Sequence, residues 1–203
     1  MPVDPTDLLI NLGAARDQGA RPTCLSFSLS EIHRAAIAFD ALLSPESLHR
    51  QASARAKKTI SEGLAFHEAT DSLNADGQAT EKDWPYHAEK PLDASCTFHR
   101  VAAVPLPFDH TTVIDALKSG QPIGLIIDVD LTFFGYIGPV ALELTASSQV
   151  QGRHAIVICG FRSSAGSFDY LIKNSWGSNW GVKGYAWLTS YHISARSPFL
   201  VRI

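Results

Sequence analysis

Three side chains that could together carry out thiol chemistry are spread through the chain: Cys24, His154 and Asn174. A thiolate is a strong nucleophile, an imidazole can exchange a proton with it, and a third group can fix the orientation of the imidazole ring. A lone cysteine or a lone histidine is usually structural, so the three residues suggest catalysis only if the fold brings them together.

Cys24 stands where a helix is expected to begin. It follows Pro22 and Thr23, and Thr23 is a plausible N-cap. The apolar residues that follow recur at intervals of four and three: Leu25, Leu29, Ile32, Ala36 and Phe39. This spacing predicts a helix of about 16 residues with one apolar face. The unpaired N–H groups of a first helical turn favour an anion, so a thiolate at Cys24 would be stabilised.

The histidine and the asparagine stand at the ends of two predicted strands. His154 opens an apolar run over residues 154–161, and Asn174 follows another run over residues 168–173. Both runs are rich in β-branched and aromatic residues, which favours strands. If these strands are neighbours, the two side chains can meet.

The first half of the chain is predicted to be mainly helical and the second half mainly strand. Further helices are expected from Ser44-Pro45, over residues 60–73 and over residues 111–119. Strands are expected over residues 122–129, 154–161, 168–173, 184–188 and 199–203. The sequence therefore predicts one α+β domain over residues 1–203, with a helical lobe at about 13–100 and a β lobe at about 101–203. Such lobes commonly meet at a cleft.

Composition limits the classes of partner. The 203 residues are 45% apolar and 18% charged, as in ordinary globular proteins. The formal net charge of −3 comes without a block of like charges, which argues against a nucleic-acid or membrane-surface partner. The longest apolar runs are far shorter than the roughly 18 residues that cross a bilayer. Partners must therefore be recognised by shape and specific groups, and the oligomeric state stays open.

Cysteine and histidine usage argues against disulfides and metals. Cys24, Cys96 and Cys159 are an odd number at wide spacing, which indicates a reducing compartment such as the cytoplasm. The amino terminus shows no secretory signal, so delivery into another cell would need a different route. No histidine pair has metal-ligand spacing, and neither a metal nor a cofactor is expected.

The segment around Cys24 carries a resemblance to a known family. Gln18-Gly19-Ala20-Arg21-Pro22-Thr23-Cys24, followed by Ser26-Phe27-Ser28, is similar to the nucleophile segment of papain-like cysteine peptidases. That family places its His and Asn about 130 to 150 residues beyond the Cys, as here. The most specific part is KNSWGSNWGVKGYAWL, from Lys173 to Leu188. The resemblance spans roughly residues 11–190. It implies a two-lobed papain-like fold, in which a helical lobe packs against a β-barrel-like lobe with the active-site cleft between them.

The resemblance also implies roles for the catalytic residues. Cys24 would be the nucleophile, and His154 would be its ion-pair partner and later the general acid. Asn174 would orient the imidazole through its side-chain oxygen. The side-chain amide of Gln18, with the backbone N–H of Cys24, would hold the oxyanion of the tetrahedral intermediate.

Four more residues take roles around these. Trp176 would cover the bond between His154 and Asn174, and Trp180 would form a wall of the substrate cleft. Arg153 would lie near a substrate side chain and favour an acidic residue. Gly63 would stand in for part of the family's Gly-Gly substrate-binding segment, which is otherwise not recognisable.

The predicted activity is hydrolysis of peptide bonds by a cysteine peptidase through an acyl-enzyme. Two alternatives stay open: a deamidase or transpeptidase with the same triad and one protein target, and a catalytically silent papain-like binding module. The chain departs from the family where secreted members carry a disulfide cysteine, because Arg21 stands there. Met1 lies only 23 residues before Cys24, so no inhibitory propeptide is expected in the chain as given.

Overall fold

The structure is a computed structural model that describes residues 8–92, 95–143, 149–164 and 166–203. The chain divides into two compact units. The helical unit contains residues 18–104 and 202–203, and the strand unit contains residues 1–17 and 105–201. The α+β class is therefore confirmed, and residues 13–17, which we expected in the helical lobe, group with the strands. Residues 1–7, where the sequence shows no secretory signal, lie outside the described residues.

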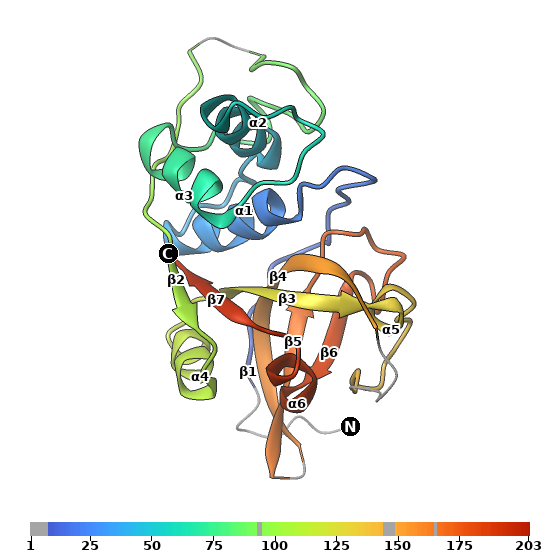
Figure 1. The fold of residues 1–203 in the computed structure, drawn as a ribbon. Helices are drawn as coiled ribbons and strands as arrows, with labels where there is room; N and C mark the ends of the chain where they lie inside the picture. The colour runs from blue at the N-terminus through green and yellow to red at the C-terminus, as the bar shows by residue number, and fades with distance from the viewer. Residues whose placement is uncertain (1–7, 93–94, 144–148, 165) are drawn as a thin grey trace. The chain divides into compact units, whose positions relative to one another are not determined.

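The described residues of the helical unit form three helices, drawn from blue to green in Figure 1: α1 (Cys24–Ala36), α2 (Pro45–Ala56) and α3 (Phe66–Ala75). Their apolar side chains, such as Leu29, Leu48 and Leu73, are fully buried. The start of α2 is as predicted, because Ser44 Oγ accepts a hydrogen bond from the backbone N–H of Ser47.

Two of these helices differ from the prediction. α1 has 13 residues and not about 16, because Ala38 adopts a left-handed conformation (φ 49°) and the Phe39 N–H closes on the Arg34 carbonyl. It is also buried on nearly all sides from Leu25 to His33, so it is a central helix and not an amphipathic helix with one apolar face. α3 begins at Phe66 and not near residue 60, since residues 59–62 form a turn.

The strand unit is built on one mainly antiparallel sheet with the order β2-β7-β3-β4-β5-β6, and β1 also pairs with β4. The strands are β1 (Leu8–Leu9), β2 (Val104–Pro107), β3 (Ile123–Asp130), β4 (Val150–Ser164), β5 (Ser167–Lys173), β6 (Tyr185–Thr189) and β7 (Phe199–Arg202). The two ends, β2 and β6, do not pair among the described residues, so the sheet is not closed into a barrel. β1 and β2 were not predicted, and β4 is longer than expected at both ends.

Within the described part of the strand unit, three helices accompany the sheet: α4 (His110–Lys118), α5 (Leu131–Phe134) and α6 (Ser190–Ser194). α4 buries Val113 and Leu117 in the core of the unit, together with strand residues such as Ile127 and Ile156. Short α5 and α6 were not predicted from the sequence. None of the helices in the described part of the chain has the length and apolarity needed to cross a membrane.

Candidate active site

Cys24 is the first residue of α1 and is half-buried. Thr23 occupies the N-cap position as expected, but its side chain makes no capping bond. Its hydroxyl lies 2.8 Å from the Tyr86 hydroxyl instead. Because the Thr23 side chain does not accept from the first-turn N–H groups, it does not offset the positive end of the helix at Cys24.

Gln18 lies in the loop before α1, and its side chain is oriented by backbone contacts. Its Nε2 donates to the backbone carbonyl of Arg21 at 2.8 Å, and the backbone carbonyl of Gln18 accepts from the Tyr86 hydroxyl at 2.8 Å. A carboxamide nitrogen carries two donors in one plane, so a bond through one N–H fixes the direction of the other. Only 6% of Gln18 is exposed.

A buried ion pair that the sequence did not reveal holds the same loop. The Glu46 carboxylate, which is not exposed, accepts from Arg21 at 2.5 and 3.2 Å, from Arg50 Nε at 2.6 Å and from the His87 N–H at 3.0 Å. Burial raises the pKa of Glu46, but these donors outweigh burial and leave the pKa below its ordinary value. The Arg21 guanidinium also lies over the Tyr86 ring at 5.0 Å.

Gly63 lies beside the loop that precedes Cys24. A Cβ atom built on it would contact Pro22, two residues before Cys24, at 3.7 Å. Its carbonyl accepts from Lys58 Nζ at 3.2 Å. The structure thus places Gly63 near the residues that precede Cys24, and its part in substrate binding stays a prediction.

His154 and Asn174 meet in the strand unit. His154 lies within β4, and Asn174 follows β5, whose last residue, Lys173, pairs with Val157 of β4. The neighbouring strands therefore bring both side chains together, and His154 Nε2 lies 2.7 Å from Asn174 Oδ1. The same oxygen accepts from the Ser175 N–H at 2.8 Å, so it is the acceptor in both bonds. The imidazole hydrogen is consequently on Nε2, and the lone pair of the neutral ring is on Nδ1.

Aromatic rings surround the imidazole of His154. Trp176 stacks on it with ring centroids 4.5 Å apart, and the ring of Phe133 approaches edge-on at 6.0 Å. Burial lowers the pKa of His154 to about 4, and the hydrogen bond to Asn174 offsets only part of this shift. Trp176 thus contacts the imidazole, and its role as a cover for the bond between His154 and Asn174 stays a prediction; the contact from Phe133 was not foreseen.

Two residues predicted to bind substrate make contacts within the strand unit. Trp180 is 7% exposed, and its indole N–H donates to the Phe133 carbonyl at 2.9 Å. Arg153 pairs with Asp128 at 2.8 Å, donates to the Ser197 carbonyl and lies over the Phe199 ring. These contacts offset the charge of Arg153, so its effect on substrate choice is expected to be small.

The candidate residues thus form two groups. Gln18, Cys24 and Gly63 belong to the helical unit, whereas His154, Asn174, Trp176, Trp180 and Arg153 belong to the strand unit. The three cysteines, all of them in the described ranges, are not joined by disulfides. Within the part of the chain that the structure describes, no group of three or more His, Cys, Asp or Glu side chains could hold a metal ion.

A comparison with protein families decides the relationship. The model of the papain family of cysteine proteases matches residues 3–195. The chain belongs to the papain family of cysteine proteases.

Two curated relatives show moderate sequence identity to this papain-family chain. It is 28% identical over 188 residues to cathepsin L1 of Drosophila melanogaster, and the match covers 85% of this chain and 49% of that protein. It is also 28% identical over 120 residues to testin-2 of Rattus norvegicus, with 54% of this chain and 35% of testin-2 covered. The chain thus spans about half or less of the length of these curated relatives.

Solved structures show the same fold. Xylellain, a cysteine protease from Xylella fastidiosa, matches with a TM-score of 0.80 and 19% identity, covering 98% of this chain and 86% of that chain. A Carica candamarcensis cysteine protease in complex with E-64 matches with a TM-score of 0.74 and 19% identity, covering 98% of each chain. The fold of this papain-family chain is therefore papain-like, as the sequence predicted.

Proposed function

We propose that this chain is a cysteine peptidase that hydrolyses peptide bonds through a thioester at Cys24, with His154 as base and acid and Asn174 as the orienting group. The observation that carries the proposal is the hydrogen bond of 2.7 Å between His154 Nε2 and Asn174 Oδ1. It assigns the ring hydrogen to Nε2, so Nδ1 is the nitrogen that can accept a thiol proton.

Acylation would run as follows. The thiol proton of Cys24 passes to His154 Nδ1, and the sulfur forms a bond to the carbonyl carbon of the peptide. As the C–N bond breaks, His154 returns the proton to the leaving amine. The developing oxyanion is held by the backbone N–H of Cys24 and the side-chain amide of Gln18, and loss of one such donor costs roughly 3 to 4 kcal/mol.

Deacylation reverses the same steps with water. The water oxygen forms a bond to the thioester carbon while His154 takes one of its protons. The C–S bond then breaks, the carboxylic acid leaves, and the proton returns to the sulfur of Cys24. The chain's own side chains suffice for both half-reactions, and the substrate is a peptide or protein.

The test combines turnover with labelling. We would incubate the chain with a mixed peptide library, detect new amino termini by mass spectrometry and repeat the reaction with E-64. We expect cleavage that E-64 blocks, an E-64 adduct on Cys24, and no cleavage by Cys24→Ala. The matched control Cys96→Ala, which removes another half-buried thiol, should cleave normally.

Other outcomes would replace the proposal. Labelling of Cys24 without cleavage, together with release of ammonia or transfer to an added amine, would indicate a deamidase or transpeptidase. Neither labelling nor turnover would indicate a binding module. Cleavage by Cys24→Ala at the rate of the unmodified chain would rule out Cys24 as the nucleophile.

A further inference from the structure

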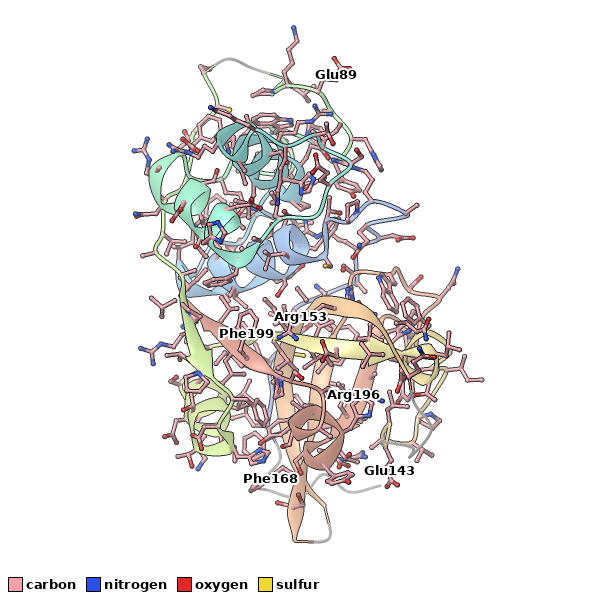
Figure 2. All side chains as sticks on the ribbon, in the orientation of Figure 1. Glu89, Glu143, Arg153, Phe168, Arg196 and Phe199 are labelled. Carbon is pink, nitrogen blue, oxygen red and sulfur yellow. The ribbon has the colours of Figure 1, made fainter. Side chains whose placement is uncertain are left out.

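A buried ion pair lies at the end of β3, outside the proposed catalytic steps. The Asp130 carboxylate is 1% exposed and pairs with the guanidinium of Arg196, whose side chain is 5% exposed. The two residues are 66 positions apart in the chain, and Arg196 follows α6 closely (Figure 2). Taking two charges out of water is costly, and this cost is offset only by their attraction and by further hydrogen bonds to the buried groups.

The two oxygens of Asp130 have different partners. Oδ1 accepts from the Phe133 N–H at 2.9 Å and from the Thr132 hydroxyl at 2.5 Å, which makes Asp130 the N-cap of α5. Oδ2 binds Arg196. A helix of four residues cannot hold itself together, because its nucleation cost exceeds what one turn returns. α5 therefore depends on Asp130, and Arg196 holds the Asp130 carboxylate.

α5 in turn places Phe133 against the candidate site. The Phe133 ring is fully buried, 6.0 Å from the ring of His154 and 5.5 Å from that of Trp176. Its carbonyl accepts from the indole N–H of Trp180 at 2.9 Å. A displacement of α5 would therefore disturb the aromatic cover of the imidazole.

The backbone at residues 196–197 is also held by hydrogen bonds. The Asp128 N–H donates to the Arg196 carbonyl at 2.9 Å. Arg153, the residue before His154, donates to the Ser197 carbonyl at 2.8 Å. Its guanidinium lies over the Phe199 ring, and Figure 2 shows the side chains of Arg153 and Phe199 close together. The segment at 196–197 is thus anchored to β3 and to β4, so the guanidinium has a fixed place from which to hold Asp130.

We propose that Asp130 and Arg196 are positioning residues for His154, because their ion pair holds α5 so that Phe133 covers the imidazole and excludes water from it. The inference rests on the proposed function, in which His154 carries the proton. The same exclusion of water explains why burial dominates the pKa of His154.

The first test measures the pKa of the His154 imidazole and does not depend on enzymatic activity. In a Cys24→Ala background with labelled histidine, the pKa of His154 is measured by NMR. For Asp130→Ala/Arg196→Met, which removes both charges of the pair, we expect a rise from about 4 toward the ordinary value of 6.5. Asp130→Asn/Arg196→Met, which also removes both charges but keeps a capping oxygen, should shift the pKa in the same direction by less.

The matched control is another ion pair of the strand unit. Arg162 pairs with Asp169 at 2.8 Å between β4 and β5, and Asp169 is also buried. Arg162→Met/Asp169→Ala should lower the Tm and leave the pKa of His154 unchanged. If this control moves that pKa as far as the Asp130/Arg196 double variant does, the effect is general loosening and the inference is wrong.

The second test is kinetic, with Cys24 in place. Loss of the pair should lower kcat roughly 10- to 100-fold with little change in KM, because it misplaces a proton carrier and not a substrate contact. Arg196→Lys keeps a cation beside Asp130 and should retain most of kcat. An unchanged His154 pKa and kcat in Asp130→Ala/Arg196→Met, or in Asp130→Asn/Arg196→Met if the first variant does not fold, would overturn the inference. A shifted pKa in a chain without peptidase activity would support the positioning role while the proposed function fails.

Discussion

A single carboxamide oxygen determines how the imidazole of His154 can act. Asn174 Oδ1 accepts from His154 Nε2 and from the Ser175 N–H, so neither the amide nor the ring can turn over without losing a bond. Asn174 is only 3% exposed, and water cannot easily replace it. The orientation of the imidazole is therefore fixed before any substrate binds.

Replacing Asn174 tests this fixed orientation. We expect Asn174→Ala to lower kcat/KM roughly 100-fold, less than the complete loss in Cys24→Ala, because misorienting a base costs less than deleting the nucleophile. The unsatisfied N–H groups of His154 and Ser175 should also lower the free energy of unfolding by about 1 to 3 kcal/mol. Peptide hydrolysis and urea unfolding measure the two effects.

A second asparagine of the strand unit provides the control. Asn11 caps a local turn by accepting from the Gly13 N–H and is exposed. Asn11→Ala should change kcat/KM very little. Full activity in Asn174→Ala would show that the imidazole is oriented by other contacts.

At the scale of elements, the loop before α1 depends on contacts from distant parts of the helical unit. Glu46 at the start of α2 holds Arg21, and Tyr86 contacts both Gln18 and Thr23. The loop has no regular structure of its own, so these contacts set where Gln18 lies. The position of the loop before Cys24 thus depends on its contacts with α2 and with Tyr86.

The Glu46 ties predict a large effect on stability. Glu46→Ala leaves Arg21 and Arg50 without their buried acceptor and should lower the free energy of unfolding by about 3 to 5 kcal/mol. Asp76→Ala breaks the more exposed Arg55–Asp76 pair of the same unit and should cost about 1 kcal/mol or less. Denaturant unfolding of both variants measures the difference, and equal losses would refute a special role for Glu46.

Element starts with strong local signals could be predicted, whereas elements held by tertiary contacts could not. α1 begins at Cys24 and α2 at Pro45, as the proline and the capping residues indicated. α5 was missed because four residues show no helical period, although Asp130 before it is a typical N-cap. β4 begins at Val150, before its apolar run, because Arg153 faces Asp128 across the sheet and this ion pair favours the pairing.

The loop that follows Asn174 returns to it at Gly184, and the backbone there makes a further prediction possible. Gly184 has φ 87°, and a Cβ there would collide with the Ala15 side chain. The Gly184 carbonyl also accepts from the Asn174 N–H at 2.9 Å. Gly184→Ala should therefore cost roughly 3 kcal/mol or more and lower kcat by moving Asn174.

The control for this turn is another glycine with a similar backbone. Gly120 has φ 77°, and a Cβ there would meet nothing within 4 Å. Gly120→Ala should cost only the left-handed strain, about 1 kcal/mol, with unchanged kcat. Thermal unfolding and peptide hydrolysis compare the two variants, and equal losses would mean that the collision with Ala15 is relieved at no cost.

For the whole molecule, the sequence indicated candidate residues for the chemistry but not the side chains that surround them. Cys24, His154 and Asn174 could be proposed from residue types, order and intervals, all of which can be read from the sequence alone. The Asp130–Arg196 pair could not be found this way, because its partners meet only after the sheet has formed. Burial of a histidine is equally a property of the finished fold.

Burial of histidines in both units predicts how the molecule responds to acid. Burial lowers the pKa of four of them: His33 and His49 in the helical unit, and His154 and His192 in the strand unit. Below pH 6.5 the unfolded chain takes up protons that the folded chain does not, so the free energy of unfolding falls as pH falls. For His154 alone, the shift from 6.5 to about 4 corresponds to about 3 kcal/mol lost over that interval.

Urea unfolding between pH 7.5 and 4.5 tests this directly. We expect stability to be nearly constant above pH 6.5 and to fall steadily below it. His154→Gln keeps a donor for Asn174 but does not titrate, so its stability should fall less steeply than that of the unmodified chain. Stability that is level or rising down to pH 4.5 would contradict the prediction, because histidines that stay neutral in the folded chain must oppose folding in acid.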